Sequence, residues 1–520
     1  DEYGRAPDEA ATIAVMRRMM GTALTHGATL WWCDFGPATR GGWYDDPALG
    51  AELGRLYDLA ARRLEDAASR VAEVLLVADL PSCYHLGDGP AMRTHYAMVD
   101  QVTGALHRTG APFDAVLLDQ LADLDLSRYR VIVFMGCLHV DAETREVVRR
   151  AAEGRSVVWL WAPGITDGAR FGPQLVTDLT GFAVDLEGEG VAASEALVEG
   201  DAAIVRHLPE VALDTLAVTA AAPVAGFSDP DNWYNPRDAE AMERYTAFEV
   251  TAEDDGVAWR VGTHDAWSDV HLRAGIEACE GVGVTVWGEG EVVNAALRVV
   301  VKDAEGAEYV SANLPVEPAP TEHRLALSGF TWAPWVREQS RPLRLPLTGL
   351  KFVLNGLGGG RVGTLHLRDL TALEGAVQRR RARLWSGPAQ GHACLTVAPE
   401  QGLTILGRRP VTSEALVAMR GAPGARQVFS ALASLPVPVI AALCEEAGVH
   451  RYVTRPDVIV QADAGLLMLH TAQGGPCELR LPAREELVDA STGVTLGTGT
   501  EFALELAPSS TLLLERRPAR

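Results

Sequence analysis

"AEVLLVAD", residues 72–79, is the first of four short apolar runs that decide the fold of this chain. It is followed by three more: FDAVLLDQ (113–120), YRVIVFMG (129–136) and SVVWLWAP (156–163). Helical segments near 94–109 and 141–153 separate the runs. Apolar strands that alternate with helices are typical of a doubly wound parallel sheet, which we predict here. No GxGxxG or GxxxxGK motif follows the first strand, so we expect no phosphate cradle for a nucleotide.

The segment that precedes these runs predicts one helix-strand-helix step. Residues 8–26 carry apolar side chains at helical spacing and stop at Gly27. ATLWWCDF (28–35) reads as a buried strand whose end turns polar, and 48–69 reads as a second helix. In an α/β barrel or an open sheet, the loop after such a strand is where ligands bind.

The segment that follows has a different character. Between 245 and 375 the helical signal fades, and short alternating strands with glycine-rich turns predict a β-sandwich of the jelly-roll type. Within it, LRVVVKDAEGAEYV (297–310) predicts a hairpin. A helix near 436–447 returns the chain to α/β character, and a last all-β segment covers 452–517.

Composition limits the function classes. The 520 residues are 48% hydrophobic and 22% charged, as expected for several globular domains, and the formal net charge is −23. Such acidity disfavours nucleic acid and anionic membranes as partners, and no run of about 18 uncharged apolar residues predicts a membrane span. The seven cysteines are dispersed, which indicates free thiols in a reducing, cytoplasmic compartment and no metal site. The chain opens on Asp1 without a signal-peptide pattern, so we expect it to be a piece of a longer protein.

The loop after the predicted strand 28–35 is rich in aromatic and acidic residues. Five residues of this strand and of the loop after it are candidate substrate-binding residues: Trp31, Trp32, Asp34, Trp43 and Tyr44. An indole offers a flat apolar face to the CH-rich side of a sugar ring, and a carboxylate accepts hydrogen bonds from its hydroxyls. The alternative is that the first two tryptophans are core residues and that nearby aspartates only cap the next helix.

The order of these parts resembles the carboxyl half of family 42 glycoside hydrolases, the β-galactosidase-like enzymes. The resemblance rests on RRMMGTALTHGATLWWCDFG (17–36), on the segment 72–137, and on IAALCEEAGVHRYV (440–453) with LLMLHTAQGGPCELRLP (466–482). It implies a (β/α)8-barrel remnant with strand eight (1–70), a flavodoxin-like, amidotransferase-like domain (71–211) that resumes as α/β in 376–450, and a carboxyl-terminal β-domain (451–520). The segment 212–375 departs from the family plan and resembles an inserted jelly roll of the carbohydrate-binding type.

The resemblance also implies a chemistry. Family members hydrolyse β-linked sugars with two carboxylic acids on different barrel strands. The acid/base would lie outside this chain, and Glu2, with Asp1 as its rival, falls where the nucleophile belongs. We therefore expect an oligo- or polysaccharide substrate, no cofactor, a homo-oligomer (a trimer by resemblance), and a fragment that is inactive alone. The alternative is a non-catalytic carbohydrate-binding or oligomerisation protein.

Two further features have a structural and a functional interpretation. Five tryptophans of the predicted sandwich could form a sugar platform or belong to its core: Trp259, Trp267, Trp287, Trp332 and Trp335. Cys137, in FMGCLH, follows a predicted strand as the nucleophile of amidotransferases does, but no downstream His-x-Glu partner is evident. For Cys137 we favour a buried structural thiol.

Overall fold

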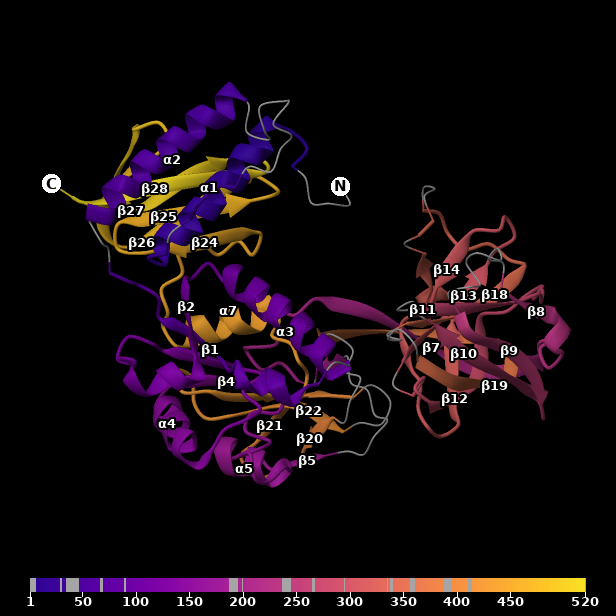
Figure 1. The fold of residues 1–520 in the computed structure, drawn as a ribbon. Coiled ribbons are helices and arrows are strands. Elements are labelled where there is room, and N and C mark those ends of the chain that lie inside the picture. Colours follow the sequence, from indigo (N-terminus) through magenta and orange to yellow (C-terminus); the bar gives the residue numbers. More distant parts are fainter. Residues whose placement is uncertain are drawn as a thin grey trace.

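The molecule consists of three bodies, an α/β domain, a β-sandwich and a carboxyl-terminal β-domain, seen side by side in Figure 1. The computed structural model describes residues 6–28, 30–33, 46–65, 69–87, 90–186, 195–198, 200–235, 245–263, 267–293, 295–333, 335–336, 340–355, 361–387, 394–409 and 414–519. The predicted combination of α/β and β domains is confirmed. None of the helices in this part of the chain has the length and apolar character needed to cross a bilayer.

The α/β domain is built on five parallel strands. They are β1 (Val74–Ala78), β2 (Phe113–Leu117), β3 (Val131–Met135), β4 (Ser156–Leu160) and β23 (Gln427–Ser430). Their order is β2-β1-β3-β4-β23, the order of flavodoxin-like sheets. The middle strands β3 and β4 are buried along their whole length, since both faces are covered, and this is why their sequences are continuously apolar.

Helices cover both faces of this sheet. In Figure 1, α3 (Pro90–His107) and α7 (Val437–Glu446) lie on the side of the carboxyl-terminal domain, and α4 (Ala142–Ala152) and α5 (Pro173–Thr180) lie on the opposite side. Beyond β23 the sheet continues with three antiparallel strands, β22 (Ala415–Arg420), β21 (Thr404–Arg408) and β6 (Glu195–Val198). A two-stranded sheet of β5 (Val184–Leu186) and β20 (Leu395–Val397) completes the domain.

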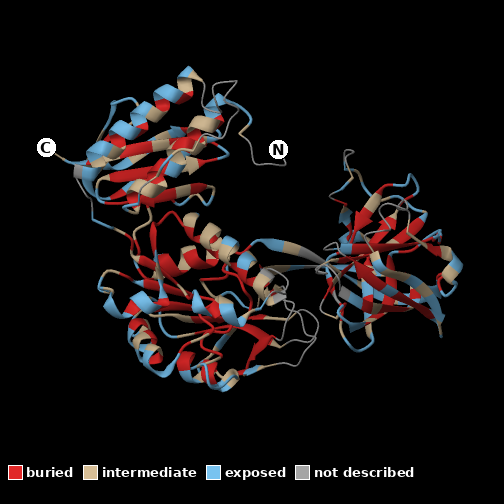
Figure 2. Ribbon diagram, in the orientation of Figure 1, coloured by how far each residue is buried: buried red, intermediate tan, exposed pale blue. Residues whose placement is uncertain are grey.

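The carboxyl-terminal domain is an antiparallel sheet covered by the first two helices of the chain. Its strands are β24 (Val458–Ala462), β25 (Leu466–Thr471), β26 (Gly475–Asp489), β27 (Thr495–Leu506) and β28 (Ser510–Pro518), in the order β24-β25-β28-β26-β27. Helices α1 (Glu9–Thr25) and α2 (Pro47–Glu65) pack on it, and their outer faces are exposed in Figure 2.

This packing corrects one expectation. The two helices lie where the sequence predicted them, but residues 28 and 30–33, the described part of the predicted strand 28–35, belong to no strand. The apolar face of α1 contacts β25 and β28, where Met16 and Met20 meet Met468 and Leu513. The barrel remnant predicted for 1–70 is therefore not confirmed. An amphipathic helix needs only an apolar surface, and here an antiparallel sheet supplies it.

The β-sandwich has two antiparallel sheets with one core between them. The first sheet contains β16 (Thr321–Ala326), β12 (Gly281–Gly290), β19 (Arg361–Ser386), β10 (Gly256–Thr263), β9 (Tyr245–Glu253) and β7 (Glu210–Pro223). The second contains β17 (Thr331–Trp332), β14 (Glu308–Val310), β13 (Ala296–Lys302), β18 (Gly349–Asn355), β11 (Trp267–Leu272), β8 (Trp233–Tyr234) and, paired with β13, β15 (Leu314–Pro315).

The hairpin predicted for 297–310 is confirmed as β13 and β14. The Asp303 carboxylate holds its turn, because it accepts hydrogen bonds from the amides of Glu305 and Ala307, both at 3.0 Å. An aspartate that binds amides two and four residues ahead is a common way to close such a turn.

A two-stranded ribbon joins the sandwich to the α/β domain (Figure 1). Residues 371–383 of β19 pair with β7, and β19 then runs on so that Leu384–Ser386 pair with β6. The basic run 379–383 lies in this ribbon, where Arg379 pairs with Asp214 at 3.0 Å. The ribbon spans the domain boundaries expected at 211/212 and 375/376.

Candidate functional site

Most of the residues predicted at the amino end lie outside the described part of the chain. This applies to Asp1, Glu2, Asp34, Trp43 and Tyr44. Of the remaining two, Trp31 is 77% exposed, whereas Trp32 is half-buried against the cluster formed by α1, α2 and the carboxyl-terminal sheet. The proposed sugar contacts of these residues stay predictions.

The five sandwich tryptophans divide into core and surface residues. Trp259 is fully buried between the two sheets. Trp287 stacks on His366 with ring centroids 4.6 Å apart, and both lie on the outer face of the first sheet, since Val286 and Leu367 beside them face the core. Trp267 and Trp335 are 41% and 42% exposed. The fifth, Trp332, lines a cavity.

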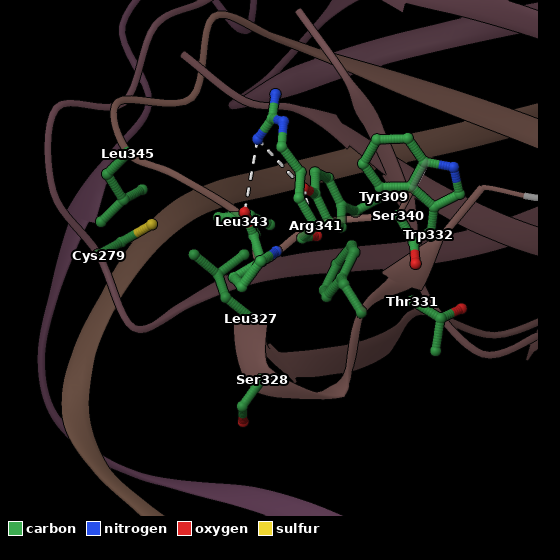
Figure 3. A pocket seen from close by; sticks show the side chains of 12 residues that line it. Cys279, Tyr309, Leu327, Ser328, Thr331, Trp332, Ser340, Arg341, Leu343 and Leu345 are labelled. Carbon is green, nitrogen blue, oxygen red and sulfur yellow. Dashed lines mark hydrogen bonds between the residues drawn. The ribbon is translucent and has the colours of Figure 1, made fainter. Parts of the chain in front are cut away.

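That cavity, which we call the Trp332 cavity, has a volume of about 770 Å³ and lies beside β17, an edge strand of the second sheet; Figure 3 shows the side chains that line it. One part of it is lined by residues 327, 328 and 330–332, and another part by residues 340–343 and 345. Tyr309 of β14 and Cys279, just before β12, complete the lining. Burial raises the pKa of the Cys279 thiol to about 11, so this group is neutral at physiological pH.

Aromatic rings form one wall of the Trp332 cavity. Tyr309 and Phe330 are buried, whereas Trp332 is half-buried and so keeps part of its indole accessible. The rings of Tyr309 and Trp332 meet edge to face, with centroids 5.3 Å apart, and the indole Nε1 donates to the Val336 carbonyl at 3.4 Å. These contacts orient the indole before any ligand arrives.

Arg341 supplies the charged part of the lining. Its guanidinium donates to both oxygens of Asp303 and forms an ion pair with Glu305 at 3.1 Å. The hydroxyl of Tyr309 donates to the Arg341 carbonyl at 2.9 Å. Burial alone would raise the pKa of Asp303, but the hydrogen bonds from Arg341 and the two turn amides hold it below its usual value. Asp303 is therefore an anionic anchor that fixes the arginine at the cavity wall.

Hydroxyl groups add hydrogen-bonding capacity. Ser328, Thr331 and Ser340 line the same cavity. No aspartate or glutamate is among its described lining residues, and Asp303 and Glu305, which contact Arg341, are held in ion pairs with arginines. The cavity thus offers an aromatic face, hydroxyls and a guanidinium, but not the pair of free carboxylic acids that glycoside hydrolysis requires.

The carboxyl ends of β1 and β3 form the second place where a ligand would be expected, because the strand order reverses there. The Cys137 thiol donates to the carbonyls of Val77 and Met135, at 3.6 and 3.8 Å, and burial raises its pKa. The Ser82 hydroxyl accepts from the amides of Leu138 and His139, at 2.8 and 3.0 Å. These bonds join the two strand ends, and they leave Cys137 a protonated structural thiol.

Within the described part of the chain, no cluster of three or more histidines, cysteines or carboxylates could hold a metal ion. The sequence analysis did not identify Tyr309, Arg341 and Asp303 as residues of a site. Tyr309 and Asp303 lie on a hairpin, and Arg341 lies on a loop more than thirty residues further along the chain. No motif links them; only the hairpin pattern, with an aspartate at its turn, could have pointed to Asp303.

Comparison with known proteins gives structural similarities only. No protein-family model matches the chain, and no curated protein matches its sequence. Among solved structures, it is similar to the β-galactosidase from Bacillus circulans sp. alkalophilus, with 14% identity and a TM-score of 0.43 over 92% of this chain and 46% of that one. It is also similar to a GH42 β-galactosidase from G. stearothermophilus, with 11% identity and a TM-score of 0.39 over 92% of this chain and 45% of that one.

A third similarity concerns part of the chain. A family 29 carbohydrate-binding module matches 32% of this chain and 94% of its own length, with 11% identity and a TM-score of 0.19. The chain spans less than half the length of the two β-galactosidases. These identities and TM-scores are too low to assign the chain to a family.

Proposed function

We propose that the β-sandwich binds a saccharide in the Trp332 cavity. The observation that carries this proposal is the combination of an oriented, half-buried indole with the Arg341 guanidinium and three hydroxyl side chains around a volume of about 770 Å³. A sugar ring presents an apolar CH face and a rim of hydroxyls, so it matches both parts of this lining. A purely apolar ligand would match only the aromatic part of this lining.

We propose further that the chain is the carboxyl-terminal portion of a glycoside hydrolase that acts on β-linked sugars. The support is the order of sequence segments described above. Because the Trp332 cavity lacks paired acids, it would bind substrate without cleaving it, and Glu2 would contribute the nucleophile of a separate catalytic centre. Assembly into a homo-oligomer through the α/β domain, in the cytoplasm, belongs to the same proposal.

The second candidate function is a non-catalytic carbohydrate-binding protein. One observation favours it: the cavity found in the described residues is built for binding and carries no catalytic pair. The two candidates differ in one measurement, which is release of nitrophenol from aryl β-galactosides by the gene product that includes any sequence upstream of Asp1. Hydrolysis that is lost in Glu2→Gln favours the enzyme, and binding without hydrolysis favours the second candidate.

Saccharide binding itself is tested by calorimetric titration of this chain with galactose, glucose and mannose oligosaccharides. Trp332→Ala should weaken binding by about tenfold or more, because truncating a central aromatic contact costs about 1.4 kcal/mol or more. Trp287→Ala is the matched control, since that indole lies on the outer face of the other sheet and should leave affinity unchanged. Equal affinities of wild type and a folded Trp332→Ala protein would refute the site.

A further inference from the structure

A second cavity of about 240 Å³ lies at one end of the outer face of the second sheet. We call it the Arg273 cavity. Tyr234 and His271 line it as neighbours on β8 and β11, and Lys302 lines it from the end of β13. Arg273 and the turn that contains Thr348 complete the wall.

The lining of the Arg273 cavity is cationic in a strongly acidic protein. His271, Arg273 and Lys302 line it, and no aspartate or glutamate is among its described lining residues. The whole chain has 46 lysines and arginines against 69 aspartates and glutamates. The lining is therefore positively charged although the chain as a whole is negatively charged, and this local positive charge favours an anionic ligand.

Arg273 is positioned by an aromatic ring. Its guanidinium carbon lies 4.2 Å from the centroid of the Tyr234 ring, and the side chain is exposed. No ion pair of Arg273 is found among the described residues. An aromatic ring restricts the guanidinium to one region and leaves its N–H groups available to a ligand.

His271 is the buried member of the lining. Its side chain is 6% exposed, and its Nε2 lies 3.1 Å from Oδ2 of Asp269. Its Nδ1 is buried and has no hydrogen-bond partner within the described structure. The imidazole thus carries one ring nitrogen that no described group of the protein satisfies.

The carboxylates near the cavity are already shared. Asp269 faces His271 and also lies 3.6 Å from Lys351. Glu308 lies 3.5 Å from both Lys302 and Lys351. These two carboxylates thus face the two lysines, Lys302 and Lys351, and no ion pair of either carboxylate with Arg273 is found among the described residues, so the charge of Arg273 has no carboxylate partner there.

We propose that the Arg273 cavity binds the oxyanion group of an acidic saccharide, a sulfate ester or a uronate carboxylate. This rests on the proposed function for the class of ligand, and the hairpin of β13 and β14 connects the two cavities, since it supplies Lys302 to this one and Tyr309 to the Trp332 cavity. A volume of about 240 Å³ suits one charged substituent and not a whole oligosaccharide.

The test is calorimetric titration of the full chain with four probes. They are inorganic sulfate, a neutral galactose oligosaccharide, the same backbone with sulfate esters, and an oligogalacturonate. We expect one acidic oligosaccharide to bind about tenfold tighter than the neutral one, with a gain that falls as salt is raised. The acidic probe that shows the gain identifies the substituent. Arg273→Gln should abolish the gain, and Arg298→Gln is the control, since it changes an arginine on the same strand as Lys302 that bonds to Asn313 instead.

The outcomes separate this inference from the proposed function. Equal affinity for acidic and neutral oligosaccharides overturns the inference and leaves saccharide binding intact. If the acidic gain survives Arg273→Gln, the anion binds elsewhere and the inference is also wrong. If no oligosaccharide binds but sulfate does, in a manner lost in Arg273→Gln, the proposed function fails and the cavity is an anion site for another ligand.

Discussion

Replacing Asp303 by asparagine tests the buried anchor on which the Trp332 cavity depends. The Asp303 carboxylate is fully buried, and its Oδ1 accepts from the amides of Glu305 and Ala307 and from Arg341 at 3.1 Å. Its Oδ2 faces a second nitrogen of Arg341. In Asp303→Asn the Oδ1 bonds can persist, but an NH2 group replaces Oδ2 and points at another donor.

The magnitude follows from these contacts. Breaking a buried ion pair by removing one charge costs about 3–5 kcal/mol. Arg341 is 23% exposed and keeps its contact with Glu305, so it recovers some solvation. We therefore expect a value at the lower end of this range: the free energy of opening the hairpin should fall by about 3 kcal/mol. Saccharide affinity at the Trp332 cavity should fall as well, because Arg341 is released.

The dependence on pH has a definite sign. The pKa of Asp303 is lowered in the folded state. Its contribution is thus present above the unfolded pKa of about 3.9 and is lost as the pH falls through the lower folded value. The difference between wild type and Asp303→Asn should shrink below about pH 4.

Hydrogen exchange of peptides covering 296–310 is the appropriate assay, because it reports opening of this hairpin within a chain of several domains. Glu305→Gln is the matched control, since Glu305 is 50% exposed and the loss should stay below about 1 kcal/mol. A loss below about 1 kcal/mol in Asp303→Asn, with unchanged saccharide affinity, would refute the anchor.

Three further predictions concern the rest of the molecule. Gly110→Ala should lower the melting temperature of the α/β and carboxyl-terminal domains in calorimetry, because a Cβ would lie 1.8 Å from the Val453 carbonyl oxygen and Gly110 has a φ of +80°. An unchanged melting temperature would contradict this contact. Met20→Ala should lower the free energy of urea unfolding by about 2–5 kcal/mol, because Met20 is buried. Met19 is 43% exposed, so Met19→Ala should lower it much less; similar losses in the two variants would show that α1 does not pack as described. Cys137 should resist iodoacetamide, followed by mass spectrometry, until the protein unfolds, and rapid alkylation in the native state would disprove its burial.

The parallel sheet could be predicted because its strands are buried on both faces. Runs such as 131–135 are apolar at every position, and that pattern suits few environments other than the middle of a covered sheet. The partner of α1 could not be predicted, since an apolar helix face packs equally well on a barrel or on an antiparallel sheet. The barrel assignment of 1–70 came from family resemblance and not from the helix pattern.

The alternation of inward and outward residues along a strand predicts the position of some tryptophans but not the cavities. In β12, valines at 282, 284 and 286 face the core, so Trp287 must face outward, and the sequence alone contained this information. The Trp332 and Arg273 cavities were not predictable in the same way. Each unites residues from strands and loops far apart in the chain, and the ion pair between Asp303 and Arg341 has no local sequence signal.

The ribbon between the sandwich and the α/β domain makes the sandwich separable by a simple cut. Glu210 and Arg383, the first and last paired residues of the β7–β19 ladder, are direct cross-strand partners. Cα atoms of such partners lie about 5 Å apart, a gap that a two-residue turn can bridge. Deleting the residues between Glu210 and Arg383 and joining the ends with an Asn-Gly linker should leave the sheet of the α/β domain intact, because β6 would still pair with Leu384–Ser386. Both cavities described above, the Trp332 cavity and the Arg273 cavity, would then be absent from an otherwise folded protein.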